Sequence, residues 1–371
     1  MTRQVIGCLL ALAIPASSQQ VSIGVVLTGG GSFGAFEAGA MRAFFAQWAE
    51  DHCPNVNPPC EPPIQVIAGA STGALIGPFV ALGSDGVKEV DGIYQDINQG
   101  DILNYKLAGI LPFGLFAKWS SSVFGVRPLQ KMLATRLPDS RLIQIANGWP
   151  GRRLVVLGTD FGTGLPTPFT SDEIVSNPSR FRDGVLASTI SPLATPPVYI
   201  KNDASRKATP NLDGGVHAVA PFKAFFDLAA RPNAVALTHV IVFSAYPQFP
   251  TPDPDEAHRI QKIYPAHPKF GDIGARMDAM ISESSISKEV ALVWAAIELR
   301  NRGVSAEIVY QQTGFNMPTP PRSLIIYAPQ QRLGWDNLHF DKTEMGRMAK
   351  LGYQASPHVL IGDLPQGMRS R

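Results

Sequence analysis

One local pattern occurs twice near the start of this chain and limits its possible folds more than any other feature. A short apolar run rich in β-branched residues stops at a glycine-rich turn, and apolar residues at helical spacing follow the turn. This order predicts a strand, a tight turn and a helix, so two such units are expected to lie side by side in an α/β sheet. The first unit comprises Ile23 to Leu27, the turn 29–34 and Ala35 to Trp48, and the second comprises Ile64 to Ile67, the turn 69–73 and Ala74 to Leu82.

The rest of the chain continues to alternate between the two kinds of element. Strands alternating with helices predict one layered α/β domain around a mostly parallel central sheet, and we assign residues 19–371 to it. A chain of 371 residues with 45% hydrophobic content can bury a large core. Further strands are predicted at Leu154 to Leu157, Val198 to Ile200, Ala236 to Ser244 and Leu324 to Tyr327, and helices at Val87 to Ile97, Pro128 to Arg136, Pro221 to Ala230 and Ile286 to Arg300.

Residues 1–18 have the composition of a secretory signal peptide. Arg3 supplies a positive charge, Val5 to Ile14 is an apolar run too short to span a membrane, and Ala16 to Ser18 provide small residues for cleavage. The protein is therefore expected to be exported, either to a periplasm or as a secreted protein. Lipid attachment at Cys8 is a weaker alternative, because a lipoprotein cysteine should follow the apolar run and most of the run comes after it.

Charge and cysteine content narrow the environment and the partners. The formal net charge is +2, and Lys and Arg are scattered without a dense basic run, so nucleic-acid binding is not expected. Once the signal peptide is removed, the remaining cysteines are Cys53 and Cys60, which lie close together in a Pro-rich loop. They suit a small disulfide in an oxidising compartment, and two free thiols are the alternative.

The second glycine-rich turn matches a serine nucleophile motif. Residues 69–73 read Gly-Ala-Ser-Thr-Gly and fit G-x-S-x-G, in which a sharp strand-to-helix turn lifts the serine hydroxyl out of the sheet. Gly69 and Gly73 prevent clashes in that strained backbone, and the helix that follows directs its N-terminal amides at a developing oxyanion. The position of the motif between a predicted strand and a predicted helix indicates Ser71 as a nucleophile.

The first glycine-rich turn, residues 29–34, supplies a run of amides without side chains at a helix start. Such a nest binds either a phosphate or an oxyanion. Three of its glycines also satisfy the G-x-G-x-x-G pattern of dinucleotide-binding folds, with Glu50 and Asp51 near the spacing of a ribose-binding acid. An exported protein meets little NAD, and a serine motif follows in the next unit, so the oxyanion interpretation is favoured.

A serine alcohol needs a neighbouring base to take its proton, and two kinds of base are available. The first is Asp213, which precedes Gly214 and Gly215; two glycines permit an unusual turn and a close approach of the carboxylate to Ser71. The second is a histidine, as in a catalytic triad. His217 lies near this motif, but a lone histidine is more often packed or exposed than catalytic.

Three motifs in this order, GGGSFG at 29, GASTG at 69 and DGG at 213, make the chain similar to the patatin-like phospholipase family. The resemblance covers most of the mature chain. It implies a three-layer α/β/α sandwich and a catalytic dyad of Ser71 and Asp213 that requires no histidine, and no cofactor is expected. It also implies an oxyanion hole built from amides of the first turn, namely those of Gly29, Gly30, Gly31 and Gly34.

One position departs from the pattern that the family often shows. Phe33 stands where Arg or Lys is common, so the glycine amides remain but a local positive charge is missing. This difference argues against a preference for anionic phospholipid head groups and leaves neutral lipids and simple esters as substrates.

The resemblance implies hydrolysis of an acyl ester bond in a lipid at or near a membrane surface, by a peripheral enzyme of the phospholipase A, lysophospholipase or esterase type. Two alternatives stay open. The chain is an α/β-hydrolase with a Ser-His-Asp triad, or an exported protein that binds a lipid or another partner without catalysis. The sequence specifies neither the head group, the acyl chain nor the oligomeric state.

Two further segments have more than one interpretation. Leu107 to Trp119 is strongly apolar but interrupted by glycine and proline, which suits a lid, a membrane contact or an irregular part of the core. The acidic stretch 253–258, with His258, is a conceivable metal site, but a solvated loop is favoured because no metal-binding spacing occurs. No metal is predicted.

Overall fold

The computed structural model describes residues 20–105, 124–148, 151–192, 195–201, 208–248, 270–334 and 336–368. The predicted signal peptide, the apolar segment 107–119 and the acidic stretch 253–258 lie outside these ranges. No helix within them combines the length and the apolarity needed to cross a bilayer.

A mixed sheet of nine strands forms the centre of the molecule, in the order β11-β10-β9-β1-β2-β5-β8-β7, with β6 also paired to β5. The inner strands β10, β9, β1, β2 and β5 are parallel, and the remaining strands pair antiparallel at the two ends. The strands are β1 (Ile23–Leu27), β2 (Ile64–Ala70), β5 (Arg153–Asp160), β6 (Pro166–Thr170), β7 (Val198–Lys201), β8 (Ala208–Asp213), β9 (His239–Phe243), β10 (Ser323–Tyr327) and β11 (His358–Ile361), and β3 (Asn104–Tyr105) and β4 (Phe124–Gly125) pair separately.

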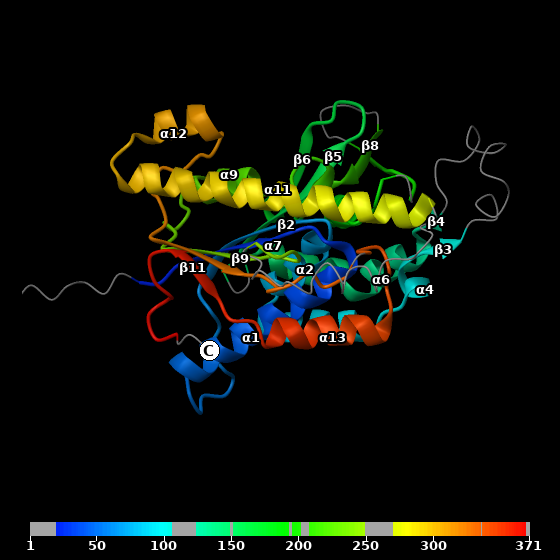
Figure 1. Cartoon of the computed structure of the whole chain (residues 1–371), viewed down its shortest axis with the longest axis horizontal. Coiled ribbons are helices and arrows are strands. Elements are labelled where there is room, and N and C mark those ends of the chain that lie inside the picture. The colour runs from blue at the N-terminus through cyan, green and yellow to red at the C-terminus, as the bar shows by residue number, and fades with distance from the viewer. Residues whose placement is uncertain are drawn as a thin grey trace, which may run out of the picture.

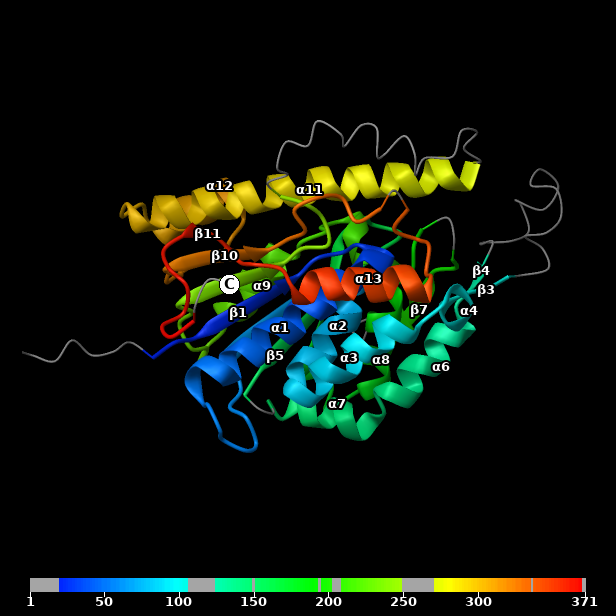
Figure 2. The same cartoon turned by 60° about the horizontal axis from the view of Figure 1, so that its bottom comes forward.

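Helices cover both faces of the sheet, and the predicted three-layer sandwich around a mostly parallel sheet is confirmed (Figure 1). One layer contains α1, α2, α3 and α13, and the long helix α11 lies on the opposite side with α9 and α12 (Figure 2). The helices are α1 (Gly34–His52), α2 (Thr72–Ala81), α3 (Ser84–Asp96), α4 (Gln99–Ile102), α6 (Arg127–Arg136), α7 (Asp139–Ala146), α8 (Pro178–Ser188), α9 (Phe222–Ala229), α11 (Phe270–Asn301), α12 (Ala306–Thr313) and α13 (Lys342–Tyr353), with short 3-10 turns η1 (Gly31–Phe33), η3 (Ser171–Glu173) and η4 (Gly214–Val216).

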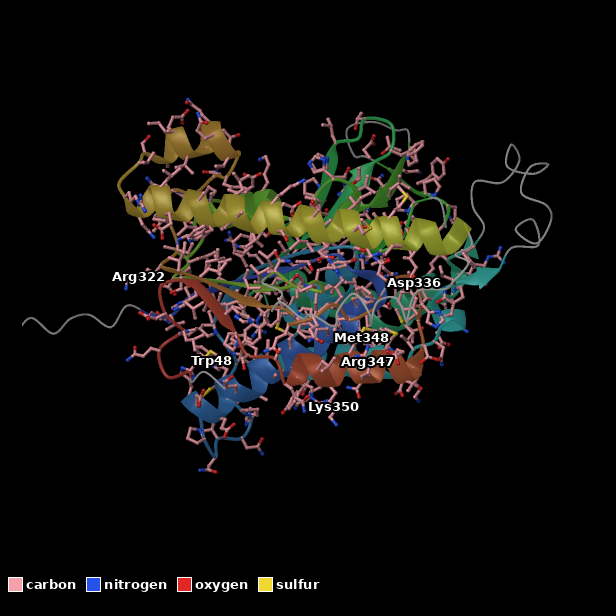
Figure 3. All side chains as sticks on the ribbon, viewed as in Figure 1. Trp48, Arg322, Asp336, Arg347, Met348 and Lys350 are labelled. Carbon is pink, nitrogen blue, oxygen red and sulfur yellow. A yellow bond between two sulfur atoms is a disulfide. The ribbon has the colours of Figure 1, made fainter. Side chains whose placement is uncertain are left out.

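The core lies on both faces of the central strands. Every residue of β1 is buried, because a parallel strand in the middle of a sheet is covered by helices on either side. The helix α13, which covers the sheet from outside, is amphipathic in the corresponding way. On α13, Met348 is buried, whereas Lys350 is exposed (Figure 3). This burial holds the carboxyl ends of β1 and β2, where the two glycine-rich turns begin, in a rigid frame.

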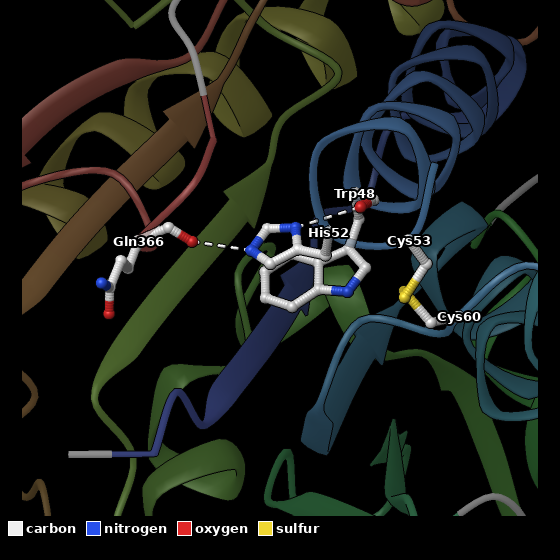
Figure 4. The surroundings of a disulfide bond; sticks show 5 residues. All are labelled: Trp48, His52, Cys53, Cys60 and Gln366. Atoms are coloured by element: carbon white, nitrogen blue, oxygen red, sulfur yellow. Dashed lines mark hydrogen bonds between the residues drawn. A yellow bond between two sulfur atoms is a disulfide. The ribbon is translucent and has the colours of Figure 1, made fainter. Parts of the chain in front are cut away.

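Cys53 and Cys60 are joined by a disulfide at the end of α1, with their Cα atoms 5.9 Å apart (Figure 4). Beside it the His52 ring stacks on Trp48, with ring centroids 3.8 Å apart, and His52 Nε2 lies 2.6 Å from the carbonyl oxygen of Gln366. The disulfide therefore closes the loop after α1, and the contact of His52 with Gln366 ties the C-terminal residues to the end of α1 that is remote from the glycine-rich turns.

Candidate active site

The pairing of β5 explains why Ser71 and Asp213 meet. Because β6 occupies one edge of β5, the strands β2 and β8 must share the other edge. Ala70, the last residue of β2, pairs with Leu157. Asp213, the last residue of β8, pairs with the next residue of β5, Gly158. The two strands run toward each other and end on consecutive residues of β5, so their C-terminal ends are neighbours. Ser71, which follows β2, therefore meets Asp213 although the two lie 142 positions apart in the sequence.

A hydrogen bond links the two side chains directly. Ser71 Oγ donates to Asp213 Oδ2 at 2.7 Å, and Asp213 is only 9% exposed. The other carboxylate oxygen, Oδ1, accepts the amide of Gly215 at 2.7 Å, while the Thr159 hydroxyl donates to the Asp213 backbone carbonyl. One carboxylate oxygen is thus oriented by the backbone, and the second is held against the serine hydroxyl. This geometry is the one that a general base for Ser71 requires.

The backbone at Ser71 is strained in the manner of a nucleophile elbow. Its φ of 53° and ψ of −123° lie in a region that side-chain-bearing residues rarely adopt. Gly73 allows this turn to pass close to β1, since a Cβ there would lie 2.4 Å from the Leu27 carbonyl oxygen. Such close approach requires glycine at that position. Gly69 lies against Gly73 in the same turn.

Ser188, at the end of α8, supports the turn that carries Ser71. The sequence alone assigned it no role. Its hydroxyl accepts the Ser71 amide at 3.0 Å and donates to the Leu157 carbonyl at 2.5 Å. Ser188 is completely buried. It therefore bonds one backbone group of the turn and one of β5.

The glycine loop after β1 lies beside the serine, and its amides have different partners. The amide of Gly29 donates to the Val219 carbonyl at 2.9 Å, and the amide of Gly34 closes the 3-10 turn onto the loop's own carbonyls. In the part of the chain that the structure describes, the amides of Gly30 and Gly31 donate no hydrogen bond. Of the four amides assigned to an oxyanion hole, these two have no acceptor among the described residues.

The conformation of Gly31 accounts for its residue type. Its φ is +54°, and a Cβ would lie 2.1 Å from the backbone oxygen of Asn337, which accepts the Ser32 amide at 2.7 Å. Phe33 points into the protein instead of toward solvent. It is buried and packs edge-on against Tyr246, with ring centroids 5.7 Å apart. The loop is thus packed closely on the side of Asn337 and Tyr246.

The histidine alternative receives no support from the geometry around Ser71. His217 is exposed on the surface after the Asp213 motif. Among the histidines within the described ranges, none forms a side-chain hydrogen bond with Ser71. In the same ranges, no three His, Cys, Asp or Glu side chains gather at a position that could hold a metal ion.

A buried carboxyl group beneath the glycine loop escaped the sequence analysis. Glu37, in the first turn of α1, is completely buried, and its Oε1 accepts the hydroxyl of Thr28 at 2.6 Å and the amide of Thr28 at 3.0 Å. Burial raises the pKa of the Glu37 carboxyl well above its usual value of 4.5, although the bonds from Thr28 act in the opposite direction. The sequence offered one indication of this buried carboxyl group: Glu37 is the single acidic residue among the small and apolar residues with which α1 begins.

Comparison with known proteins identifies the family of the chain. The family model described as patatin-like phospholipase matches residues 25–226, which include both glycine-rich turns and Asp213. The match covers more than half of the chain, and the chain belongs to the patatin-like phospholipase family. The fold is accordingly a patatin fold.

Among solved structures, the chain is similar to the crystal structure of VipD from Legionella pneumophila, with 12% sequence identity and a TM-score of 0.42. The similarity covers 89% of this chain and 65% of that chain, so this chain spans less than two thirds of the length of VipD. A comparison with curated proteins found no match.

Proposed function

We propose that this protein is a lipid acyl hydrolase that cleaves ester bonds through a covalent intermediate on Ser71, with Asp213 as the base. The observation that carries the proposal is the 2.7 Å hydrogen bond from Ser71 Oγ to Asp213 Oδ2, at the end of a strained strand-to-helix turn. Membership of the patatin-like phospholipase family supports a lipid as the substrate class.

The chemistry proceeds in two steps. In the first step, Asp213 takes the Ser71 proton while Oγ attacks the ester carbonyl carbon; collapse of the tetrahedral intermediate expels the alcohol, which receives the proton from Asp213. In the second step, water gives a proton to Asp213 and attacks the acyl-enzyme, which releases the fatty acid and returns the proton to Ser71. The negative oxygen that develops in both steps is stabilised by the amides of Gly30 and Gly31, which have no other hydrogen bond within the described residues.

The position of Phe33 bears on the substrate. Its ring is buried against Tyr246, so this position brings no cation to the mouth of the site. We therefore propose that neutral lipids and simple esters are accepted at least as well as lipids with anionic head groups.

Two further proposals concern where the enzyme works. The apolar start of the chain and the disulfide between Cys53 and Cys60 support export to an oxidising compartment, periplasmic or extracellular. A lipid substrate supports peripheral association with a membrane surface. Cell fractionation, followed by N-terminal sequencing of the mature protein, checks the export proposal.

The dyad is tested with variants of its two members. We expect Ser71→Ala and Asp213→Asn each to lower kcat/KM by on the order of 10⁴-fold or more, because nucleophile and base act as one unit. Asp227→Asn is the matched control, since Asp227 is a surface partner of Lys223 on α9. Hydrolysis of a short p-nitrophenyl ester, and covalent labelling by a fluorophosphonate, are the measurements.

Three outcomes would contradict the proposal. Loss of activity in His217→Ala would indicate a triad, full activity in Asp213→Asn would remove the base, and absence of both turnover and labelling in the folded protein would indicate a binding protein. A panel of glycerides, phospholipids, lysophospholipids and short esters then compares neutral with anionic substrates.

A further inference from the structure

The long helix α11 lies outside the region that the family model matches, yet two of its side chains reach the surroundings of the glycine loop. The match ends at residue 226, and α11 begins at Phe270. In two views α11 crosses the face of the sheet opposite to α1 and α13 (Figures 1 and 2). Glu283 and Glu289 connect this helix to two different segments, each of which is bonded to the loop.

The first connection runs through Glu289 to the start of the loop. Glu289 Oε2 accepts the amide of Ala220 at 2.6 Å, and Oε1 accepts the Ser285 hydroxyl at 2.8 Å. The neighbouring residue, Val219, accepts the Gly29 amide at 2.9 Å. Val219 Cγ1 also lies 3.3 Å from the position that a Cβ of Gly29 would occupy. Glu289 therefore fixes the backbone against which the first glycine of the loop rests.

The second connection runs through Glu283 to the other end of the loop. The carboxylate of Glu283 binds the Arg332 guanidinium with both oxygens, at 2.9 and 3.0 Å, a geometry that fixes orientation as well as distance. Arg332 belongs to the segment after β10 that continues to Asn337. The Asn337 carbonyl accepts the Ser32 amide at 2.7 Å. The far end of the loop thus bonds to Asn337, which lies close in the sequence to the arginine that α11 binds.

Little space is left between the helix and the loop. A crevice lined by Phe33, Ala279, Glu283, Arg332 and other residues has a volume of about 10 Å³, which is roughly the room that one water molecule needs. Glu289 is also largely removed from solvent, and this burial raises the pKa of its carboxyl despite the hydrogen bonds that it accepts. A carboxyl group in such a place is tolerated when donors surround it, as the Ala220 amide and the Ser285 hydroxyl do here.

We infer that α11 is a working part of the active site, in which Glu289 and Glu283 are positioning residues that hold the two ends of the glycine loop and keep the amides of Gly30 and Gly31 in place. The inference rests on the proposed function, because it assigns these amides to the oxyanion. The amides that bind the oxyanion cannot themselves anchor the loop, so the anchors must lie elsewhere. α11 provides them from beyond the family-matched region.

The test compares two replacements of Glu289. We expect Glu289→Ala to lower kcat for a short soluble ester by about 10-fold or more, with KM nearly unchanged, because displaced amides lose transition-state binding but not substrate binding. Glu289→Gln should keep most of the activity, since its amide oxygen can still accept the Ala220 proton and the Ser285 hydroxyl can reverse its role. Glu298→Ala is the control, because Glu298 lies on the same helix and pairs with Arg302 at the surface.

A second measurement does not depend on turnover. Hydrogen exchange followed by mass spectrometry should show faster exchange of residues 27–34 in Glu289→Ala than in the native chain or in Glu298→Ala. Unchanged kcat and unchanged exchange in a folded Glu289→Ala protein would overturn the inference, as would an equal loss in the Gln variant. If the Ala variant does not fold, Glu283→Ala breaks the second connection and is judged by the same criteria. If the native protein hydrolyses nothing, the proposed function fails. The exchange data alone then decide whether Glu289 and Glu283 hold the glycine loop in place.

Discussion

The turn after β2 and the loop after β1 carry the two halves of the proposed active site, and they are held in different ways. The turn is anchored by its nearest neighbours in the fold: Ser71 lies where two strands meet on β5, and its amide is bonded to Ser188. The loop takes its anchors from three parts of the chain, two of which are far from it in the sequence. Glu37 holds its start from α1, and Val219 and Asn337 accept amides from its two ends.

The difference follows from what each part must offer to a substrate. A nucleophile presents a side chain, so its backbone groups are free to be bonded within the protein. An oxyanion hole presents backbone amides, and an amide that binds the oxyanion cannot also anchor its own loop. The loop must therefore be held through its flanking residues and through packing. We expect the loop to be the more easily disturbed of the two by changes far from Ser71.

The largest expected effect after loss of the dyad comes from placing a side chain on the loop. In Gly31→Ala, the Cβ would meet the Asn337 carbonyl oxygen at 2.1 Å, and alanine disfavours the φ of +54°. We expect kcat/KM to fall by about 10²-fold or more, as for loss of one oxyanion donor. Gly92→Ala, on α3, is the matched control, because no atom lies within 4 Å of its Cβ position. A folded Gly31→Ala protein with native activity would contradict the role of the loop.

A smaller effect is expected from removing the support of the turn. Ser188→Ala leaves the Ser71 amide and the buried Leu157 carbonyl without their hydroxyl partner. We expect about 1–3 kcal/mol less stability in urea unfolding and about tenfold lower kcat, because the sheet still places Ser71 next to Asp213. Ser179→Ala, at the exposed start of the same helix, should change neither quantity. If Ser188→Ala lowered activity as much as Gly31→Ala, the turn and the loop would be equally sensitive to the loss of their supports.

The smallest effect on activity is expected at Glu37, where the informative quantity is stability against pH. Because burial raises the pKa of this carboxyl in the folded protein, proton binding stabilises the fold fully below about pH 4.5, and this contribution is lost as pH rises toward the folded value. Glutamine does not titrate. The unfolding free energy of the native chain minus that of Glu37→Gln should therefore fall as pH rises, by at most about 1.4 kcal/mol per pH unit. Urea titrations at about pH 5 and about pH 8 measure it. A constant difference would show that Glu37 has an ordinary pKa.

Much of the fold was predictable because local patterns and the sheet agree. The strand Ile23–Leu27 was predicted with its observed bounds, and the helices after the two glycine turns begin within two residues of prediction. These elements are buried on both faces or follow glycine turns, and both features mark the sequence strongly. Helix α11 was predicted only from Ile286, yet it begins at Phe270, because its outer surface carries exposed residues such as Met280 and Ile281 and its apolar spacing is weak there.

The strand that carries the base was not predicted as a strand at all. Ala208–Asp213 contains Pro210 and Asn211 and has no apolar alternation, so only the two glycines after Asp213 marked the position. Its place in the sheet depends on pairing with β5 and β7, which are distant in the sequence. Glu37 was missed for a related reason: an acidic residue on a helix suggests solvent, and it is buried because the loop, α1 and Ala245 close over it.

The sequence by itself determined the chemical groups of this protein: a serine in a glycine turn, an aspartate before two glycines, and a run of amides without side chains. These are local features, because a few adjacent residues define each of them. Only the tertiary structure decided that serine and aspartate touch, which amides of the loop donate no hydrogen bond within the described residues, and that side chains of α11 bind segments near the loop. Those outcomes depend on strand register, burial and hydrogen bonds between residues far apart in the chain, and no local pattern records them.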